Sequence, residues 1–150
     1  MIQKNENKKG SDFGKGKESA RVIRYYGTEK IIEMMKNKQY IEAFVHTQLG
    51  VEKILWDRIL GIFEDELAIK IRQLIENYRK GEDKSRTNTG ELIKWAHFLT
   101  AIDDNEHGEL IDFNRKRNMI MHGHGAWYNE NEYEEALNKG IRFLNKYGLH

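Results

Sequence analysis

The chain has 150 residues and a net charge of +1, and 39% of its residues are hydrophobic, which is enough for one domain with a buried core. It has no cysteine, which excludes disulfides and thiolate metal sites, and no apolar run approaches the roughly 18 residues of a membrane span. Proline is absent, so the composition favours helix. Residues 1–16 lack the apolar core of a signal peptide, and we expect a cytoplasmic protein.

Basic residues are concentrated at the start of the chain. Residues 1–24 hold seven Lys and Arg against three Asp and Glu, whereas the remainder holds 18 against 21. Such a composition is typical of a disordered segment. We therefore expect a flexible basic leader over 1–24 and a single helical domain over 25–150. The acidic balance of that domain excludes a broad duplex-binding surface, so any nucleic-acid site must be local.

Apolar residues recur at helical spacing and predict six helices, over residues 29–37, 39–64, 65–80, 89–103, 105–122 and 130–147. Thr28 is expected to cap the first helix. Asn88 and Asn129 are each followed three residues later by a glutamate, which is the spacing of a capping box. Gly123 is placed to end the fifth helix in the left-handed conformation. No stretch alternates with period two, so the sequence predicts an all-α, up-and-down bundle of four to six helices.

The fifth predicted helix interrupts its apolar stripe with an arginine. Leu110, Phe113 and Ile120 mark the stripe, and Arg117 stands where leucine or isoleucine would be expected. A guanidinium cannot lose its charge there and needs an anionic partner or a wet cleft. Glu52, which interrupts the stripe of the long second helix, is the expected partner. The alternative is that Glu52 lies at the stripe's edge with its carboxylate in solvent.

A polar strip runs beside the apolar one. Asn114, Asn118 and His122 fall at four-residue steps and therefore share one face of the helix. Arg117 and His122 are five residues apart, which separates them by about 140° around the axis and about 7.5 Å along it. A joint site needs the long reach of Arg117, fraying of the last turn near Gly123, or a second copy of the helix in a two-fold dimer.

The run from Arg117 through Asn118 to His122 resembles the Arg-x4–6-His motif of the HEPN superfamily, in its form with a polar residue after the arginine. HEPN domains are small α-helical bundles, usually dimeric, and the predicted bundle over about 28–147 is similar in length and helix order. For active members the resemblance implies metal-independent RNA cleavage at a homodimer interface, with no cofactor. It assigns His122 as general acid/base, Arg117 as the group that holds the scissile phosphate, and Asn118 as the group that orients the histidine or a phosphate oxygen.

The residues around the motif complete the expected RNA-binding surface: Arg115, Lys116, His124 and Tyr128. Tyr128 follows the motif in a short loop, where an aromatic ring either stacks on a base or packs on the bundle. His122 and His124 are also spaced as half of a metal site. Because no cysteine or His-Glu-x-x-His pattern supports that interpretation, we expect no metal.

Three functions fit these patterns. The first is a homodimeric ribonuclease, a toxin or defence component, whose partner is a cognate antitoxin or a nucleotidyltransferase-type protein. The second is a non-catalytic HEPN-type module that binds RNA, nucleotide or a protein through the same groove. The third is a helical bundle without a nucleic-acid role, in which Arg117 forms a buried ion pair with Glu52.

Overall fold

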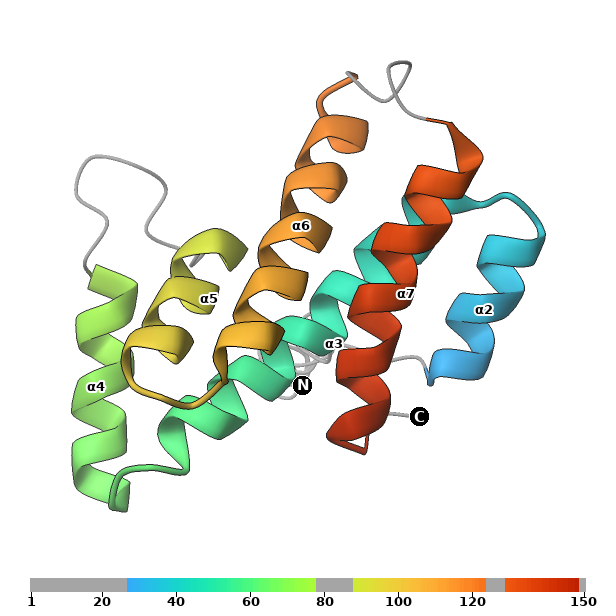
Figure 1. Ribbon diagram of the computed structural model, residues 1–150. Helices are drawn as coiled ribbons and strands as arrows, with labels where there is room; N and C mark the ends of the chain where they lie inside the picture. The colour runs from blue at the N-terminus through green and yellow to red at the C-terminus, as the bar shows by residue number, and fades with distance from the viewer. Residues whose placement is uncertain (1–26, 78–87, 124–128, 149–150) are drawn as a thin grey trace, which may run out of the picture.

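The structure, a computed structural model, describes residues 27–77, 88–123 and 129–148. Over these residues the chain is an all-α bundle without strands (Figure 1), as predicted. Its helices are α2 (Thr28–Lys36), α3 (Tyr40–Leu60), α4 (Asp65–Asn77), α5 (Thr89–Phe98), α6 (Asp104–Met121) and α7 (Glu130–Lys146). The basic leader predicted over 1–24 lies outside the described residues.

The long helix α3 is the centre of the bundle, because it packs against each of the other five helices. Its buried residues lie on more than one side, and Phe44, Val51, Leu55 and Ile59 are all fully buried. A helix that is apolar around much of its circumference must be covered on all those sides. The helices α6 and α7 lie side by side and antiparallel across it, with α5 next to α6 (Figure 1).

Two glycines let α7 approach its neighbours closely. A Cβ atom on Gly140 of α7 would lie 2.5 Å from Cγ2 of Thr47 and 3.1 Å from the ring of Phe113. A Cβ atom on Gly50 of α3 would lie 2.8 Å from Cδ2 of Leu144. Neither position has room for a larger residue without movement, so α3, α6 and α7 interlock where these glycines stand.

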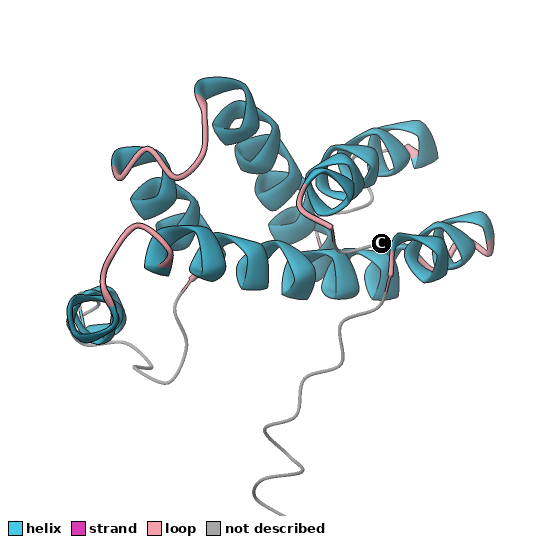
Figure 2. Ribbon diagram, turned by 90° about the horizontal axis from the view of Figure 1, so that it is seen from below, coloured by secondary structure: helices cyan, strands magenta, loops and turns pink. Residues whose placement is uncertain are grey.

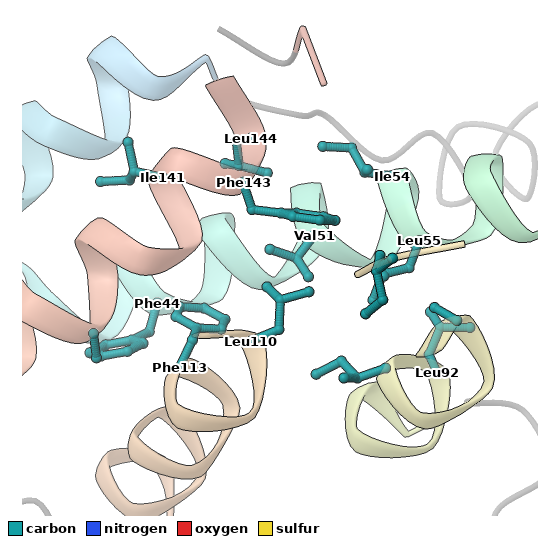
Figure 3. Close-up of a cluster of buried hydrophobic side chains, with 14 of the residues drawn as sticks. Phe44, Val51, Ile54, Leu55, Leu92, Leu110, Phe113, Ile141, Phe143 and Leu144 are labelled. Atoms are coloured by element: carbon teal, nitrogen blue, oxygen red, sulfur yellow. The ribbon is translucent and has the colours of Figure 1, made fainter. Parts of the chain in front are cut away.

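The centre of the core lies among the same three helices, and buried residues of α2, α4 and α5 extend it. The rings of Phe44 and Phe113 stack with their centroids 5.5 Å apart, and Val51 and Leu110 lie beside them (Figure 3). Leu110 and Phe113 are the stripe residues predicted for α6, and both are fully buried. The core therefore fixes which face of α6 points inward, and with it the directions of all the polar side chains on that helix.

Asn88 and Asn129 are the N-caps of α5 and α7 as predicted, but neither forms the reciprocal pair of hydrogen bonds of the predicted capping box. The Asn88 side chain accepts a hydrogen bond from the backbone of Gly90 at 2.7 Å, and that of Asn129 accepts one from Glu132 at 2.9 Å. The prediction for Thr28 was wrong: Gly27 is the N-cap of α2, and Thr28 lies inside the helix. Thr28 is buried, and its hydroxyl donates to the side chain of Asn145 on α7 instead.

Two predicted helix ends were also wrong. The helix α3 ends at Leu60 rather than 64, with Gly61 as its C-cap. The helix α5 ends at Phe98 rather than 103, because Thr100 adopts a left-handed φ of 59° and the chain turns back. The amide of Ala101 then bonds the carbonyl of Ala96 at 2.8 Å, a six-to-one closure of the kind that ends many helices.

The helix α4 is peripheral. It packs chiefly against α3, and α4, the leftmost helix of Figure 1, remains at the edge of the bundle when seen from below (Figure 2). Its Leu67, Ile69 and Leu74 are about half exposed, whereas Ile75 is buried. Across the described part of the chain, every helix is too short or too polar to cross a lipid bilayer.

Candidate functional site at the end of helix α6

The start of α6 is set by a side-chain cap and its end by a glycine in the left-handed conformation. At the start, Asp103 and Glu106 form a reciprocal capping box: the Asp103 side chain accepts from the Glu106 amide at 2.7 Å, and the Glu106 side chain accepts from the Asp103 amide at 2.9 Å. At the end, His122 is the C-cap and Gly123 has a φ of +81°. The left-handed role predicted for Gly123 is confirmed.

Arg117 lies on the inward side of α6, one turn beyond the buried Phe113. It is half-buried, and its Nη1 donates a hydrogen bond to the Oδ1 of Asn118 at 3.0 Å. Ile120, the next residue of the stripe, packs against the core. The guanidinium is therefore held at the rim of the core, with its orientation set in part by its neighbour's amide.

His122 lies at the open end of the same helix. Its backbone amide donates to the carbonyl of Asn118 at 3.0 Å, which places His122 one turn above Asn118 as predicted. The imidazole is exposed and makes no hydrogen bond to any of the residues that the structure describes. Arg117 and His122 flank Asn118 in the sequence but are about 140° apart around the helix axis, so the guanidinium and the exposed imidazole of one chain face different directions.

Arg115 and Lys116 have different surroundings. Arg115 is exposed and bonds Oδ1 of Asp112 at 2.7 Å. The Lys116 side chain is only 11% exposed and pairs with the same carboxylate at 3.3 Å, as does Lys139 of α7 at 2.8 Å. Asp112 thus joins three cations, and Lys116 lies between α6 and α7 rather than on an open surface. His124 and Tyr128 lie outside the described residues.

Glu52 is not the partner of Arg117, and that expectation was wrong. Its carboxylate accepts a hydrogen bond from Nε2 of Gln48 at 3.0 Å and another from the hydroxyl of Thr89. Gln48 also bonds Thr89, at 2.7 Å. Since Thr89 is the first residue of α5, this network joins α3 to α5. The buried ion pair expected between α3 and α6 is replaced by a polar contact between α3 and α5.

Asn114 is a polar side chain that the sequence placed on the same face as Asn118 but did not single out. The structure sets its amide against the first turn of α5, because a Cβ atom on Gly90 would lie 3.3 Å from the Nδ2 of Asn114. Gly90 permits this approach because it has no side chain. The sequence could indicate the contact only if α5 and α6 were already known to be neighbours. Asn114, Asn118 and His122 thus extend from α5 to the end of α6.

A second polar cluster lies at the opposite end of α6 and was missed by sequence reasoning. Glu106 is buried there, and its carboxylate accepts a hydrogen bond from the Tyr147 hydroxyl and pairs with Lys146 at 3.2 Å. Burial and the bond to Glu106 raise the pKa of Tyr147. This cluster borders an open cavity of about 570 Å³ whose lining includes Arg58, but its acidic groups are bonded within the cluster.

Two histidines line up beside that cavity. The rings of His97 and His107 stack with centroids 3.8 Å apart, and Nε2 of His97 is 2.7 Å from the carboxylate of Asp104. The hydrogen bond from His97 lowers the pKa of Asp104, while burial and the neighbouring His97 lower the pKa of His107. Among the described residues, no group of three such side chains is arranged to hold a metal ion, and these two histidines are remote from His122 along the chain.

No family model matches the sequence, and the comparisons with curated proteins and with solved structures found no similar protein. The geometry of the site is therefore the basis for assigning a function.

Proposed function

We propose that the protein is a metal-independent endoribonuclease of the HEPN type. The observation that carries this proposal is the arrangement at the end of α6, where the Arg117 guanidinium bonds Asn118 and an exposed His122 follows one turn later. An arginine that holds a phosphate and a histidine that moves a proton are sufficient for cleavage of RNA at its own 2′-hydroxyl. In this proposal Arg115, His124 and Tyr128 contact the RNA beyond the cleaved bond, whereas Lys116, paired with Asp112 between α6 and α7, does not.

The reaction we propose uses the substrate as its own nucleophile. The 2′-oxygen loses its proton and forms a bond to phosphorus, and the bond from phosphorus to the 5′-oxygen breaks as that oxygen gains a proton. The products are a 2′,3′-cyclic phosphate and a 5′-hydroxyl end. His122 carries one of these protons and solvent water exchanges the other, while Arg117 stabilises the charge on the phosphate oxygens. General acid–base catalysis contributes about 10²–10⁴ in rate and electrostatic stabilisation about 10²–10³.

The active unit in this proposal is a homodimer. Arg117 and His122 are about 140° apart around one helix, so each site is most simply built from Arg117 of one chain and His122 of its partner. The protein would act in the cytoplasm as a toxin or defence component, restrained by a cognate antitoxin or a nucleotidyltransferase-type protein. The alternative, a non-catalytic module that binds RNA or nucleotide, uses the same arginine without turnover.

The direct test is cleavage of a mixed-sequence RNA in EDTA by the wild type, by His122→Ala and by Arg117→Ala. Each substitution is expected to lower kcat/KM by about 10²–10⁴. Arg142→Ala, an exposed arginine of α7 that pairs with Glu109, is the matched control and should retain activity. Equal cleavage by all four proteins would refute the assignment. RNA binding without cleavage by the wild type would favour the non-catalytic module.

Mixing the two inactive variants tests the dimeric site. In a mixed dimer, one composite site regains both an intact Arg117 and an intact His122, so the mixture should recover about a quarter of wild-type activity. A site contained in one chain would recover none. Sedimentation of the wild type as a monomer at tens of micromolar would also contradict the composite site.

A further inference from the structure

The side chain of Asn114 has hydrogen-bonding groups that the protein itself does not use. Asn114 is half-buried, one turn before Asn118 and two turns before His122, and it bonds no other residue in the parts of the chain that the structure describes. Its carboxamide offers two donors and one acceptor on one planar edge. A half-buried amide in this position is available to a ligand that reaches the motif.

The wall opposite Asn114 is held rigidly. It is the first turn of α5, where the backbone amide of Gly90 donates to Oδ1 of Asn88 at 2.7 Å and Thr89 is almost fully buried. Both donors of the Gln48 amide are already used, one on Glu52 and one on Thr89, which ties this turn to α3. The first turn of α5 is held in place by these hydrogen bonds to α3, and Gly90 has no side chain. The carboxamide of Asn114 therefore lies against a rigid backbone surface and keeps one orientation.

The spacing along α6 matches successive groups of an extended nucleic-acid strand. Asn114 and Asn118 are separated by four residues, or about 6 Å of helix rise, which is comparable to one nucleotide. Ile111 and Met121 on the same side of α6 are 46% and 39% exposed, and they provide apolar surface on which an unstacked base can pack. A strand whose phosphate is at Arg117 would therefore bring a neighbouring base to Asn114.

The charges place a base rather than a second phosphate beside Asn114. The permanent cation Arg117 lies three residues after Asn114 and bonds Asn118, whereas the carboxylate of Glu52 bonds Thr89 behind the first turn of α5, the turn against which Asn114 stands. In the part of the chain that the structure describes, Glu52 is bonded only by the neutral groups of Gln48 and Thr89. A phosphate is favoured near the arginine and disfavoured near this carboxylate, whereas a neutral base is accepted there.

We propose that Asn114 reads the base next to the cleaved phosphate and selects adenine in single-stranded RNA. A planar carboxamide matches adenine with two parallel bonds, accepting from N6 and donating to N7. Such bases are readable only where the strand is unpaired, since the major groove of an RNA duplex is too narrow for side chains. This inference rests on the proposed function, because the motif at Arg117 supplies the phosphate position from which Asn114 is one nucleotide away.

The test compares four short single-stranded RNAs that differ in one base beside the cleaved bond. Cleavage by the wild type is expected to favour adenine by roughly 5- to 150-fold in kcat/KM. Asn114→Ala should lose the preference while still cleaving, and Asn114→Asp should shift it to cytosine, whose amino group donates to a carboxylate. The control Asn105→Ala removes an exposed asparagine from the first turn of the same helix and should keep the adenine preference.

Binding separates failure of this inference from failure of the proposed function. The same four strands, with a 2′-deoxy nucleotide at the cleaved position, are titrated against each protein by fluorescence anisotropy. Loss of cleavage in Arg117→Ala and His122→Ala, together with an unchanged base preference in Asn114→Ala, overturns the inference and leaves the ribonuclease standing. Absence of cleavage with adenine-selective binding that depends on Asn114 supports the base-reading site and rejects the enzyme. Binding without base preference overturns the inference in either case.

Discussion

The two halves of α6 differ in what their side chains are bonded to. In the first half, which is the part up to Phe113, the capping box at Asp103, the buried Glu106 and the stacked Phe113 are all bonded or packed against the bundle. In the second half, Asn114 and His122 have no hydrogen bonds from their side chains to the described residues. The first half of α6 thus stabilises the bundle, and the second half carries the side chains of the proposed site. Substitutions in the first half should change the free energy of unfolding, and substitutions in the second half should change RNA cleavage.

The largest expected effect is on stability, from Phe113→Ala. Phe113 is fully buried and stacks on Phe44, so its removal leaves a cavity between α3 and α6. Truncation of a buried phenylalanine costs about 3–5 kcal/mol in the free energy of unfolding, which denaturant titration measures. Met121→Ala in the second half, at 39% exposure, serves as the control and should change it by less than about 0.5 kcal/mol. Equal losses would erase the distinction between the halves.

Asp112→Asn is the next largest change and has a pH dependence. Burial alone would raise the pKa of Asp112, but the bond from Lys139 and the charge of Lys116 outweigh it and lower the pKa. A lowered pKa stabilises the fold above the ordinary value of an aspartate and loses that contribution as pH falls through the lowered value. Loss of a charged hydrogen bond costs about 1.5–3 kcal/mol.

Melting temperatures of the wild type and Asp112→Asn between pH 7 and pH 2 check this prediction. The difference between the two proteins should be constant near neutral pH and shrink as pH falls below about 4, because the carboxyl is protonated first in the unfolded chain and then, at its lowered pKa, in the folded protein. A difference that stays constant down to pH 2 would show that the charge of Asp112 contributes nothing.

Gly140→Ala should destabilise the protein by about 1–3 kcal/mol, because the new methyl group would lie 2.5 Å from Thr47 and overpack the contact. Gly108→Ala on α6 is the matched control. A Cβ atom there meets nothing within 4 Å, so the better helix propensity of alanine should stabilise by about 0.5–1 kcal/mol. If thermal unfolding shows that Gly140→Ala lowers stability and Gly108→Ala raises it, the close contact is located at Gly140. Equal signs would contradict it.

The smallest expected effect on stability comes from Asn118→Ala in the second half. The Asn118 side chain is half-buried and accepts one bond from Arg117, at the rim of the core. Its loss should change the free energy of unfolding by less than about 1 kcal/mol. RNA cleavage should nevertheless fall clearly, because the guanidinium loses the group that orients it. A variant that is destabilised as much as Phe113→Ala would place Asn118 in the core instead.

The periodicity of the sequence predicted the order of the helices and the inward face of α6, because Leu110 and Phe113 repeat at helical spacing and are buried. It missed the capping box at Asp103, since an acidic pair three residues apart is common and the previous helix was expected to run to 103. The true end of α5 depends on the left-handed residue Thr100, for which a threonine gives no warning.

The candidate site was predicted only as far as one helix determines it. Arg117, Asn118 and His122 lie on α6 where their spacing placed them. The partner of Glu52 was predicted wrongly, because periodicity shows which side of α3 a residue faces but not which helix lies on that side. For the same reason, periodicity did not show that Asn114 of α6 lies against Gly90 of α5. Contacts between helices require the packing of the whole bundle.

The attachment of α4 chiefly to α3 has a consequence for hydrogen exchange. A helix that shares little buried surface with its neighbours opens without disturbing them, so its amides exchange through local openings of low free energy. We expect the amides of α3 and α7 around the close contacts at Gly50 and Gly140 to exchange only when the whole bundle unfolds. Hydrogen exchange is therefore expected to divide the described helices into a cooperative group of five and α4, which opens locally.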